Sequence, residues 1–432
     1  MPKQILHEKL DLKELVAMGV GGMVGGGIFS VLGLSVGLAG HAAYFAFAVG
    51  GIIALLTGHS YGKLGLAFRS DGGSFTYMEK TVKNENIAAI GGWLLLVGYI
   101  GTLALYSYTF GIYGAAMTGS GPQILILQHF LESFILLLFL GINLYGIKAA
   151  GHTEVLIVLT KVIILFLFAG IGIYFVKSDH LFPIFNTGGG NMIIGAAVIF
   201  VAYEGFELIP NAVHEMKNPG RDLPRSILIS IIITIIIYLL VSFVAVGNLS
   251  GAMISKYKEY ALAAAAKPFL GQAGFVLIGI GALLSTASAI NATLFGTARL
   301  GMVMAQDKAL PKAFSFRERT RDIPWLSLVL ITLVTLVFVN VSDLTLISSF
   351  ASSTFLLIFI FINYSAIKLH KQIGIGRLPP LLGLILSAGC WIILIGYLWQ
   401  TSTKGLEWIG GFYAFIILAE LAFSERRILR KK

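Results

Sequence analysis

The sequence has little charge and almost no cysteine. Asp, Glu, Lys and Arg make up 12% of its 432 residues, whereas 57% are hydrophobic, and the mean hydropathy is +0.87. In soluble domains roughly a quarter of the residues are charged. This composition therefore excludes a soluble domain and indicates a polytopic membrane protein. The single cysteine, Cys390, excludes a disulfide framework and a metal cluster built from cysteines.

Twelve apolar segments are long enough to cross a bilayer as helices. They cover residues 15–38, 43–68, 88–117, 124–146, 153–176, 191–213, 226–247, 272–305, 324–340, 344–368, 380–400 and 406–425. The predicted fold class is therefore an all-α polytopic membrane protein with 12 transmembrane helices.

Acidic residues are outnumbered by basic ones, 21 to 31, and the net charge is +10. With the N-terminus inside, 23 of the Lys and Arg residues fall on the cytoplasmic side and five on the outer side. Such a bias sets the orientation of membrane proteins, so topology explains the charge and we expect no nucleic-acid partner. It predicts a cytoplasmic segment at 1–14 and a basic cytoplasmic tail at 426–432.

The first apolar segment has a weak point where residues 19–30 read GVGGMVGGGIFS, with six glycines in nine positions. Glycine costs about 1 kcal/mol relative to alanine inside a helix. Two interpretations follow. The glycines form GxxxG pairs for close packing, or the helix is discontinuous and its N–H groups at Gly25, Gly26 and Gly27 face an anion.

A second weak point lies in the sixth segment, where residues 200–211 read FVAYEGFELIPN. Gly205 and Pro210 interrupt the helix, and Glu204 and Glu207 are carboxylates at membrane depth, which are rare and usually functional. Interruptions at corresponding positions of two halves are the best sequence indication of a transporter's midplane site. This pairing favours two discontinuous helices.

Lys161 is the third polar feature, because it lies eight residues after Thr153 and thus about 12 Å into the fifth segment. Such a lysine either extends to the interface or serves inside the protein. The apolar run VIILFLF follows it, which favours an internal group that loads and releases a proton, or a fixed cation in place of a sodium ion.

At these residues the chain resembles the amino acid–polyamine–organocation (APC) family of permeases. GGGIF at residues 25–29 matches the family signature, although Gly26 replaces a frequent serine or threonine. The run GFELIPNAVHEMKNPGRDLPRSI at 205–227 matches the end of segment six and the following loop, and 218–225 hold the frame NPxRxxPR. The resemblance extends over nearly the whole chain in segment number and order.

The resemblance implies a LeuT-like fold with a 5+5 inverted repeat, formed by residues 15–176 and 191–368, discontinuous helices 1 and 6, and two further helices at 380–425. It also implies that an amino acid binds between the two interruptions, its carboxylate on the glycine N–H groups and its amine on carbonyls near Gly205. The implied substrate-binding residues are Met23, Gly25, Gly26, Gly27, Ile28, Tyr99, Tyr203, Glu204, Gly205, Phe206 and Glu207.

Lys161 resembles the segment-five lysine of proton-coupled members, and its expected partners are the carbonyl of Gly21 and the hydroxyl of Ser285 or Ser288. The role of Glu204 stays open: it favours cationic substrates, pairs with a helix dipole or is protonated.

The predicted function is a secondary active transporter that imports amino acids across the cytoplasmic membrane by proton symport and alternating access. No nucleophile triad or metal motif is evident, so we expect no enzyme and no cofactor beyond the coupling proton. The alternatives are an amino acid/amine exchanger of the same fold and, in a different class, a channel, for which no filter motif is evident. The sequence specifies neither the substrate nor the oligomeric state.

Overall fold

The computed structural model describes residues 9–70, 72–82, 84–119, 124–145, 151–316 and 323–423. Within these residues the chain is almost entirely helical, and the extended pairing is one isolated bridge between Leu10 and Met216. The predicted all-α class is confirmed. Residues 1–8 of the predicted N-terminal segment, and the tail at 426–432, lie outside the described residues.

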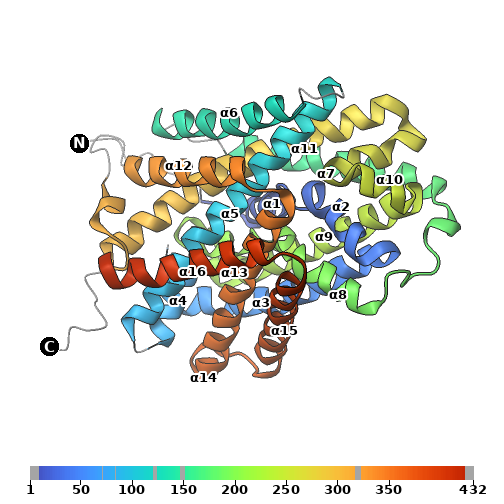
Figure 1. The fold of residues 1–432 in the computed structure, drawn as a ribbon. Coiled ribbons are helices and arrows are strands. Elements are labelled where there is room, and N and C mark those ends of the chain that lie inside the picture. The colour runs from blue at the N-terminus through green and yellow to red at the C-terminus, as the bar shows by residue number, and fades with distance from the viewer. Residues whose placement is uncertain are drawn as a thin grey trace.

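The helices follow the predicted apolar segments in order (Figure 1). The first half contains α1 (Leu12–Met23), α2 (Gly27–Ala39), α3 (Ala43–Ala67), α5 (Glu85–Thr118), α6 (Ile124–Tyr145) and α7 (Gly151–Gly172). The second half contains α8 (Gly189–Val198), the 3-10 helices η4 (Phe200–Tyr203) and η5 (Phe206–Glu215), α9 (Pro219–Asn248), α11 (Ala261–Gln306), α12 (Trp325–Val341) and α13 (Leu344–Lys368), and it is followed by α15 (Leu378–Thr401) and α16 (Thr403–Phe423).

Short helices form the connections between these elements. They are η1 (Gly40–Ala42), α4 (Gly73–Thr81), η2 (Ile173–Phe175), η3 (Ser178–His180), α10 (Gly251–Lys256), η6 (Lys258–Tyr260), η7 (Lys312–Ser315) and α14 (His370–Ile373).

Nine helices of the described chain are long and apolar enough to cross a membrane, or ten if α8 and the following 3-10 helices form one bent span. The difference from the twelve predicted spans has local causes. Residues 27–67, which include α2 and α3, count as one unit, the sixth segment is bent, and α12 has only 17 residues. The number twelve stays a prediction.

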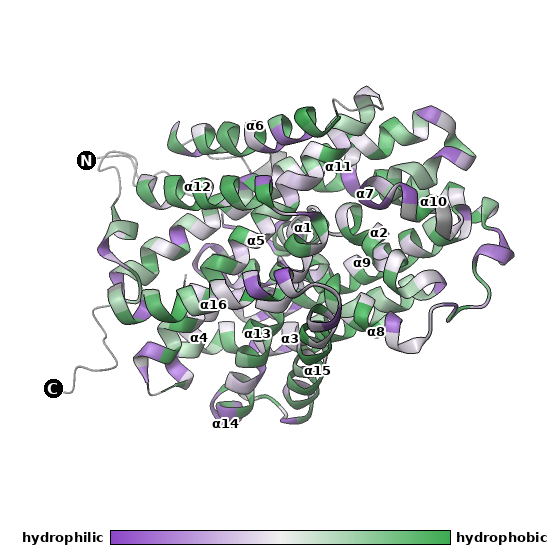
Figure 2. Cartoon of the chain, viewed as in Figure 1, coloured by the Kyte–Doolittle hydropathy of each residue, from purple (hydrophilic) through white to green (hydrophobic). Residues whose placement is uncertain are grey.

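The outer faces of the bundle suit a lipid environment. Figure 2 shows largely hydrophobic surfaces on α6, α12, α15 and α16, while hydrophilic residues gather in the connections near α4 and α10, at opposite ends of the molecule. Exposed side chains on these faces include Ile126 (74%), Val337 (65%) and Ile392 (63%). Backbone groups within hydrocarbon must be paired internally, and the long helices meet this requirement.

The interior is formed around α5 and the two interrupted segments. The side chains that α5 presents at Leu103, Ala104 and Leu105 are fully buried, and α5 packs against α11, α6 and α13. On the other side of the interior, α1 and α3 both pack against α9. The facing ends of α1 and α2 and the carboxyl end of α8 are therefore buried, at Met23, Gly27 and Val198.

The chain just before α1 is tied to the chain just after η5. The Leu10 N–H donates to the carbonyl of Glu215 (2.8 Å), and the Lys217 N–H donates to the carbonyl of Leu10 (2.9 Å). The Asp11 side chain then caps α1 by accepting from the N–H groups of Lys13 and Glu14 (2.9 and 3.2 Å). The two interrupted segments are therefore joined by backbone at one end.

The packing of α2 generates a stability prediction. A Cβ at Gly33 would overlap the carbonyl oxygen of Lys258 in η6, whereas a Cβ at Gly37 in the same helix meets nothing within 4 Å. Gly33→Ala is expected to cost about 1–3 kcal/mol, because it forces packed backbone apart. Gly37→Ala is the control and should leave the apparent Tm in detergent unchanged or higher. Equal Tm values for the two variants would contradict this packing.

Candidate functional site at the crossing of two interrupted helices

The first segment is interrupted at residues 24–26, between α1 and α2. The Gly25 N–H donates to the carbonyl of Gly22 (3.1 Å), and the first bond of the new helix runs from the Ser30 N–H to the carbonyl of Gly26 (2.9 Å). The first N–H groups of a helix have no intrahelical partner. The amino end of α2, with its partial positive charge, therefore lies in the protein interior, as the sequence predicted for a discontinuous helix.

The sixth segment is interrupted at Glu204 and Gly205, between η4 and η5. The pair formed by α8 and residues 200–215 is bent by 55°. Gly205 has a φ of +127°, a conformation that glycine adopts much more readily than any other residue. The second predicted discontinuity is therefore also present.

The two interruptions touch through bare backbone. A Cβ on Gly22 would lie 3.0 Å from the Cα of Gly205, and a Cβ on Gly205 would lie 2.6 Å from the carbonyl carbon of Gly22. Both positions require glycine for this reason. Close packing and helix interruption, the two interpretations of the glycine-rich stretch, thus occur together, because the glycines let one broken segment cross the other.

Hydroxyl groups of neighbouring helices pair the carbonyls that the interruptions free. The Tyr238 hydroxyl on α9 lies 2.6 Å from the Met23 carbonyl and 2.9 Å from the Ala202 carbonyl, so one side chain joins both segments. Ser285 on α11 donates to the carbonyl of Val24. In a membrane interior each unpaired carbonyl would cost several kcal/mol, so these side chains make the interruptions possible.

Serines of α13 pair the end of α8 in the same way. The hydroxyls of Ser348 and Ser352 each donate to the carbonyl of Val198 at 2.8 Å, and Ser352 Oγ accepts from the N–H of Val201 at 2.9 Å. The sixth segment is therefore held on one side by α13 and on the other by α9.

Glu204 and Glu207 form a buried pair of acidic side chains, with exposures of 2% and 1%. Tyr106 donates to Glu204 Oε2 (3.2 Å), Tyr99 donates to Glu207 Oε1 (3.4 Å), and the Gly205 N–H donates to Glu207 Oε2 (2.8 Å). In the described parts of the chain neither acid forms an ion pair. Two neighbouring carboxylates cannot both ionise cheaply when buried, so this pair suits a proton or a positive group of a ligand.

Tyr106 fills the space beside the glycines of the first interruption. Its side chain is 2% exposed, its ring would overlap a Cβ on Gly26, and its Cζ would lie 3.2 Å from a Cβ on Gly25. Its hydroxyl also donates to the carbonyl of Gly22 (3.2 Å). The Tyr106 ring thus packs directly against the glycines at the amino end of α2.

Two of the aromatic residues predicted at the site point toward other helices. Phe206 packs edge-on against Tyr61 of α3 at 5.6 Å between ring centroids and lies against Phe359 of α13 at 5.4 Å. Tyr203 donates to the carbonyl of Phe47 on α3 (2.7 Å). Met23, Ile28 and Tyr99 are buried, and the Tyr99 hydroxyl reaches the acid pair.

Lys161, on α7, bonds to the residue of α1 that precedes the one bonded by Tyr106. Its side chain is fully buried, and its Nζ donates to the carbonyl of Gly21 at 2.8 Å, as expected. The serines expected beside it make other bonds: Ser285 donates to Val24, and Ser288 donates to both carboxylate oxygens of Glu154 at 2.8 Å. The sequence interpretation missed Glu154.

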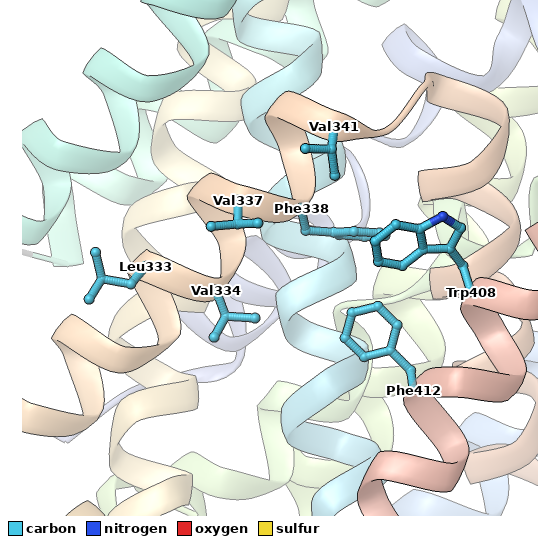
Figure 3. A pocket seen from close by; sticks show the side chains of 7 residues that line it. All are labelled: Leu333, Val334, Val337, Phe338, Val341, Trp408 and Phe412. Carbon is cyan, nitrogen blue, oxygen red and sulfur yellow. The ribbon is translucent and has the colours of Figure 1, made fainter.

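A surface groove lies far from these groups in the fold. Leu333, Val334, Val337, Phe338 and Val341 of α12 line it together with Trp408 and Phe412 of α16 (Figure 3). Its lining is apolar and belongs to the faces that suit lipid. Apart from the indole N–H of Trp408, the side chains that line it are apolar, so the groove is a poor match for a zwitterion.

The fold and the crossing define an α-helical membrane protein in which two helices are interrupted against each other. Residues 10–419 match the family described as amino acid permease, and the chain belongs to this family. The sequence resemblance is thus confirmed, and the family is one of transporters and not an enzyme class.

The relatives extend over almost the full chain. An uncharacterized protein of Methanocaldococcus jannaschii is 33% identical over 423 residues, which cover 98% of this chain and 97% of the relative. An inner membrane transport protein of Escherichia coli is 29% identical, with coverage of 98% and 97%. A serine/threonine exchanger of Bacillus subtilis is 28% identical, with coverage of 90% and 91%.

The bridging role of Tyr238 can be tested. Tyr238→Phe removes the hydroxyl that pairs the carbonyls of Met23 and Ala202, and the loss of buried pairing is expected to cost about 1–3 kcal/mol. The apparent Tm in detergent should fall. Tyr364→Phe is the matched control, because Tyr364 is 44% exposed on α13. A Tyr238→Phe protein as stable as this control would contradict the bridging role.

Proposed function

We propose that the protein is a secondary active transporter that imports an amino acid across the cytoplasmic membrane together with a proton, by alternating access. The observation that carries this proposal is the crossing of two interrupted helices with the Lys161 ammonium bonded to the carbonyl of Gly21. Freed peptide groups, a pair of acids and a buried ammonium lie around one crossing, and transporters bind substrate and coupling ion at such interruptions.

The substrate carboxylate binds the amino end of α2, at the N–H groups of Gly26 and Gly27, once the Tyr106 ring has moved. The substrate ammonium binds beside Gly205, where backbone carbonyl oxygens and the carboxylate of Glu204 are the available acceptors. The Glu204 Oε1 atom is buried and has no hydrogen-bond partner within the described structure. This assignment treats the family's amino acid substrate as a zwitterion held mainly by backbone.

The proton couples to this site through Lys161. While it is charged, the ammonium attracts the freed carbonyl of Gly21 and holds α1 against α7. Loss of the proton removes the charge-assisted bond, which is stronger than a neutral one. A ligand shifts a conformational equilibrium only by its different affinity for the two states, and this bond supplies such a difference for the proton.

The proposed architecture is the 5+5 inverted repeat with twelve spans and both termini in the cytoplasm. The interruption between α1 and α2 in the first half and the one between η4 and η5 in the second half support it. The cytoplasmic excess of Lys and Arg supports the orientation.

An exchanger is the second candidate, because one relative bears the name serine/threonine exchanger. An exchanger needs substrate on the far side of the membrane and no proton gradient. Uptake into vesicles with and without internal substrate separates it from a symporter, and saturable uptake separates both from a channel.

Proton coupling is testable in proteoliposomes with labelled amino acids. We expect saturable uptake that an inward proton gradient increases and that sodium does not affect. Lys161→Ala should lose the dependence on the gradient. Lys63→Ala is the control, because this lysine is partly exposed on α3. Uptake that requires sodium, or an unchanged proton dependence in Lys161→Ala, would refute proton coupling through this residue.

A thermal-shift screen against the twenty amino acids and common amines would identify the substrate. A ligand at 100 times its Kd stabilises the folded state by about 2.7 kcal/mol, so the substrates should raise the apparent Tm by several degrees. We expect the shift to be smaller in Glu204→Gln when the ligand is an amino acid. The absence of any shift across the whole set would contradict the proposed substrate class.

A further inference from the structure

We propose that Glu154 exchanges the coupling proton with Lys161 and passes it to the cytoplasmic solution. This inference rests on the proposed function, and it assigns a residue to the proton path on the cytoplasmic side of the crossing. In the transfer, the Lys161 ammonium becomes an amine, the Glu154 carboxylate becomes a carboxylic acid, and the acid then releases its proton to water.

Glu154 and Lys161 lie on one face of the same helix. They are seven residues apart on α7, which is about two helical turns and a rise of roughly 10 Å. Side chains at this spacing point in similar directions. Glu154 is in the first turn, near the predicted cytoplasmic end, and Lys161 is deeper in the membrane.

Glu154 also lies against Gly21, the residue whose carbonyl bonds Lys161. A Cβ on Gly21 would lie 3.1 Å from Glu154 Oε1, and the carbonyl of Gly21 accepts from Lys161 at 2.8 Å. On its other side, Ser288 of α11 donates to both carboxylate oxygens at 2.8 Å. The carboxylate thus lies where α1, α7 and α11 meet.

The charged group that acts on Lys161 from the surrounding elements is Glu154. The other carboxylates of the crossing, Glu204 and Glu207, are bonded to tyrosines of α5. The remaining groups bonded there are neutral: the backbone of Gly21 on α1, the hydroxyls of Ser285 and Ser288 on α11, and the Tyr238 hydroxyl on α9. Within the described residues, the carboxylate of Glu154 is thus the acceptor that lies beside Gly21, the bonding partner of Lys161.

The two groups differ in their access to water. Lys161 is fully buried, whereas Glu154 is partly exposed. Within the described structure they form no direct ion pair, so the transfer requires a bridging water or rotation of the Glu154 side chain. Protonated Glu154 and neutral Lys161 together remove the attraction that holds α1 against α7, which links proton release to movement of α1.

The test uses full-length protein in liposomes and separates net proton-coupled uptake from counterflow, which needs no net proton transfer. Glu154→Gln keeps the size of the side chain and an oxygen for Ser288 but cannot accept a proton. We expect gradient-driven uptake to fall about tenfold or more, within the range of typical coupling effects, and its pH profile to flatten. Counterflow should stay within about twofold of the wild type, because binding of substrate is intact.

Two further variants make the result decisive. Glu154→Asp keeps a carboxyl group in a slightly different place, so it should keep proton-coupled uptake with a shifted pH profile, and Glu407→Gln, an exposed carboxylate on α16, should change nothing. If Glu154→Gln does not fold, Glu154→Asp decides alone: a shifted pH profile supports the inference and an unchanged one overturns it.

Three results would overturn the inference. An unchanged pH profile in Glu154→Gln, with a proton-coupled wild type, refutes the role of Glu154 and leaves the proposed function intact. Equal loss of uptake and counterflow assigns Glu154 a purely structural role. A wild type without proton dependence refutes the proposed function, and the proton path with it.

Discussion

The contact between Gly22 and Gly205 is the constraint on which the rest of the interior depends. Two broken segments approach until backbone meets backbone, and no side chain fits between them. Each broken end frees peptide groups that lipid cannot pair. The protein supplies the missing partners from outside the two segments, through Tyr238 on α9, Ser285 on α11 and Ser352 on α13. The positions of these three hydroxyl-bearing residues are thus explained by one geometric cause.

Charge is divided around this crossing. The acid pair Glu204 and Glu207 is bonded to tyrosines of α5, whereas Lys161 is bonded to the last turn of α1. Within the described residues the lysine and the acids form no ion pair with each other, and both contact the last turn of α1, the lysine at Gly21 and the acids through Tyr106 at Gly22. In the proposed mechanism, a change of charge at Lys161 acts on the acid pair through the position of α1 and the carbonyl of Gly21, without direct contact between the proton-bearing group and the acids.

Much of this arrangement could be predicted from the sequence, because it depends on local residue type. The partnership of Lys161 with Gly21 was implied by the family resemblance, whereas both interruptions were predicted from the residues themselves, because clustered glycines weaken a helix wherever it packs. The contacts of Tyr106 and Glu154 were not, since they join segments far apart in the chain. Ser288 illustrates the limit: its helix was predicted correctly, but which of two nearby polar groups it bonds depends on the rotation of α11 relative to α7, which periodicity alone does not determine.

The bridge between Leu10 and Met216 has a consequence for how the molecule moves. Its two hydrogen bonds join the chain before α1 to the chain after η5. The helices α1 and η5 are therefore connected at this bridge as well as at the crossing. The bridge and the crossing of Gly22 with Gly205 attach the two segments at two points, so we expect α1 and η5 to move together. If α1 moves, either η5 moves with it or the two hydrogen bonds of Leu10 break. Each such bond contributes only about 1 kcal/mol to stability. Leu10, two residues ahead of α1, thus helps to set how easily α1 and η5 move relative to each other.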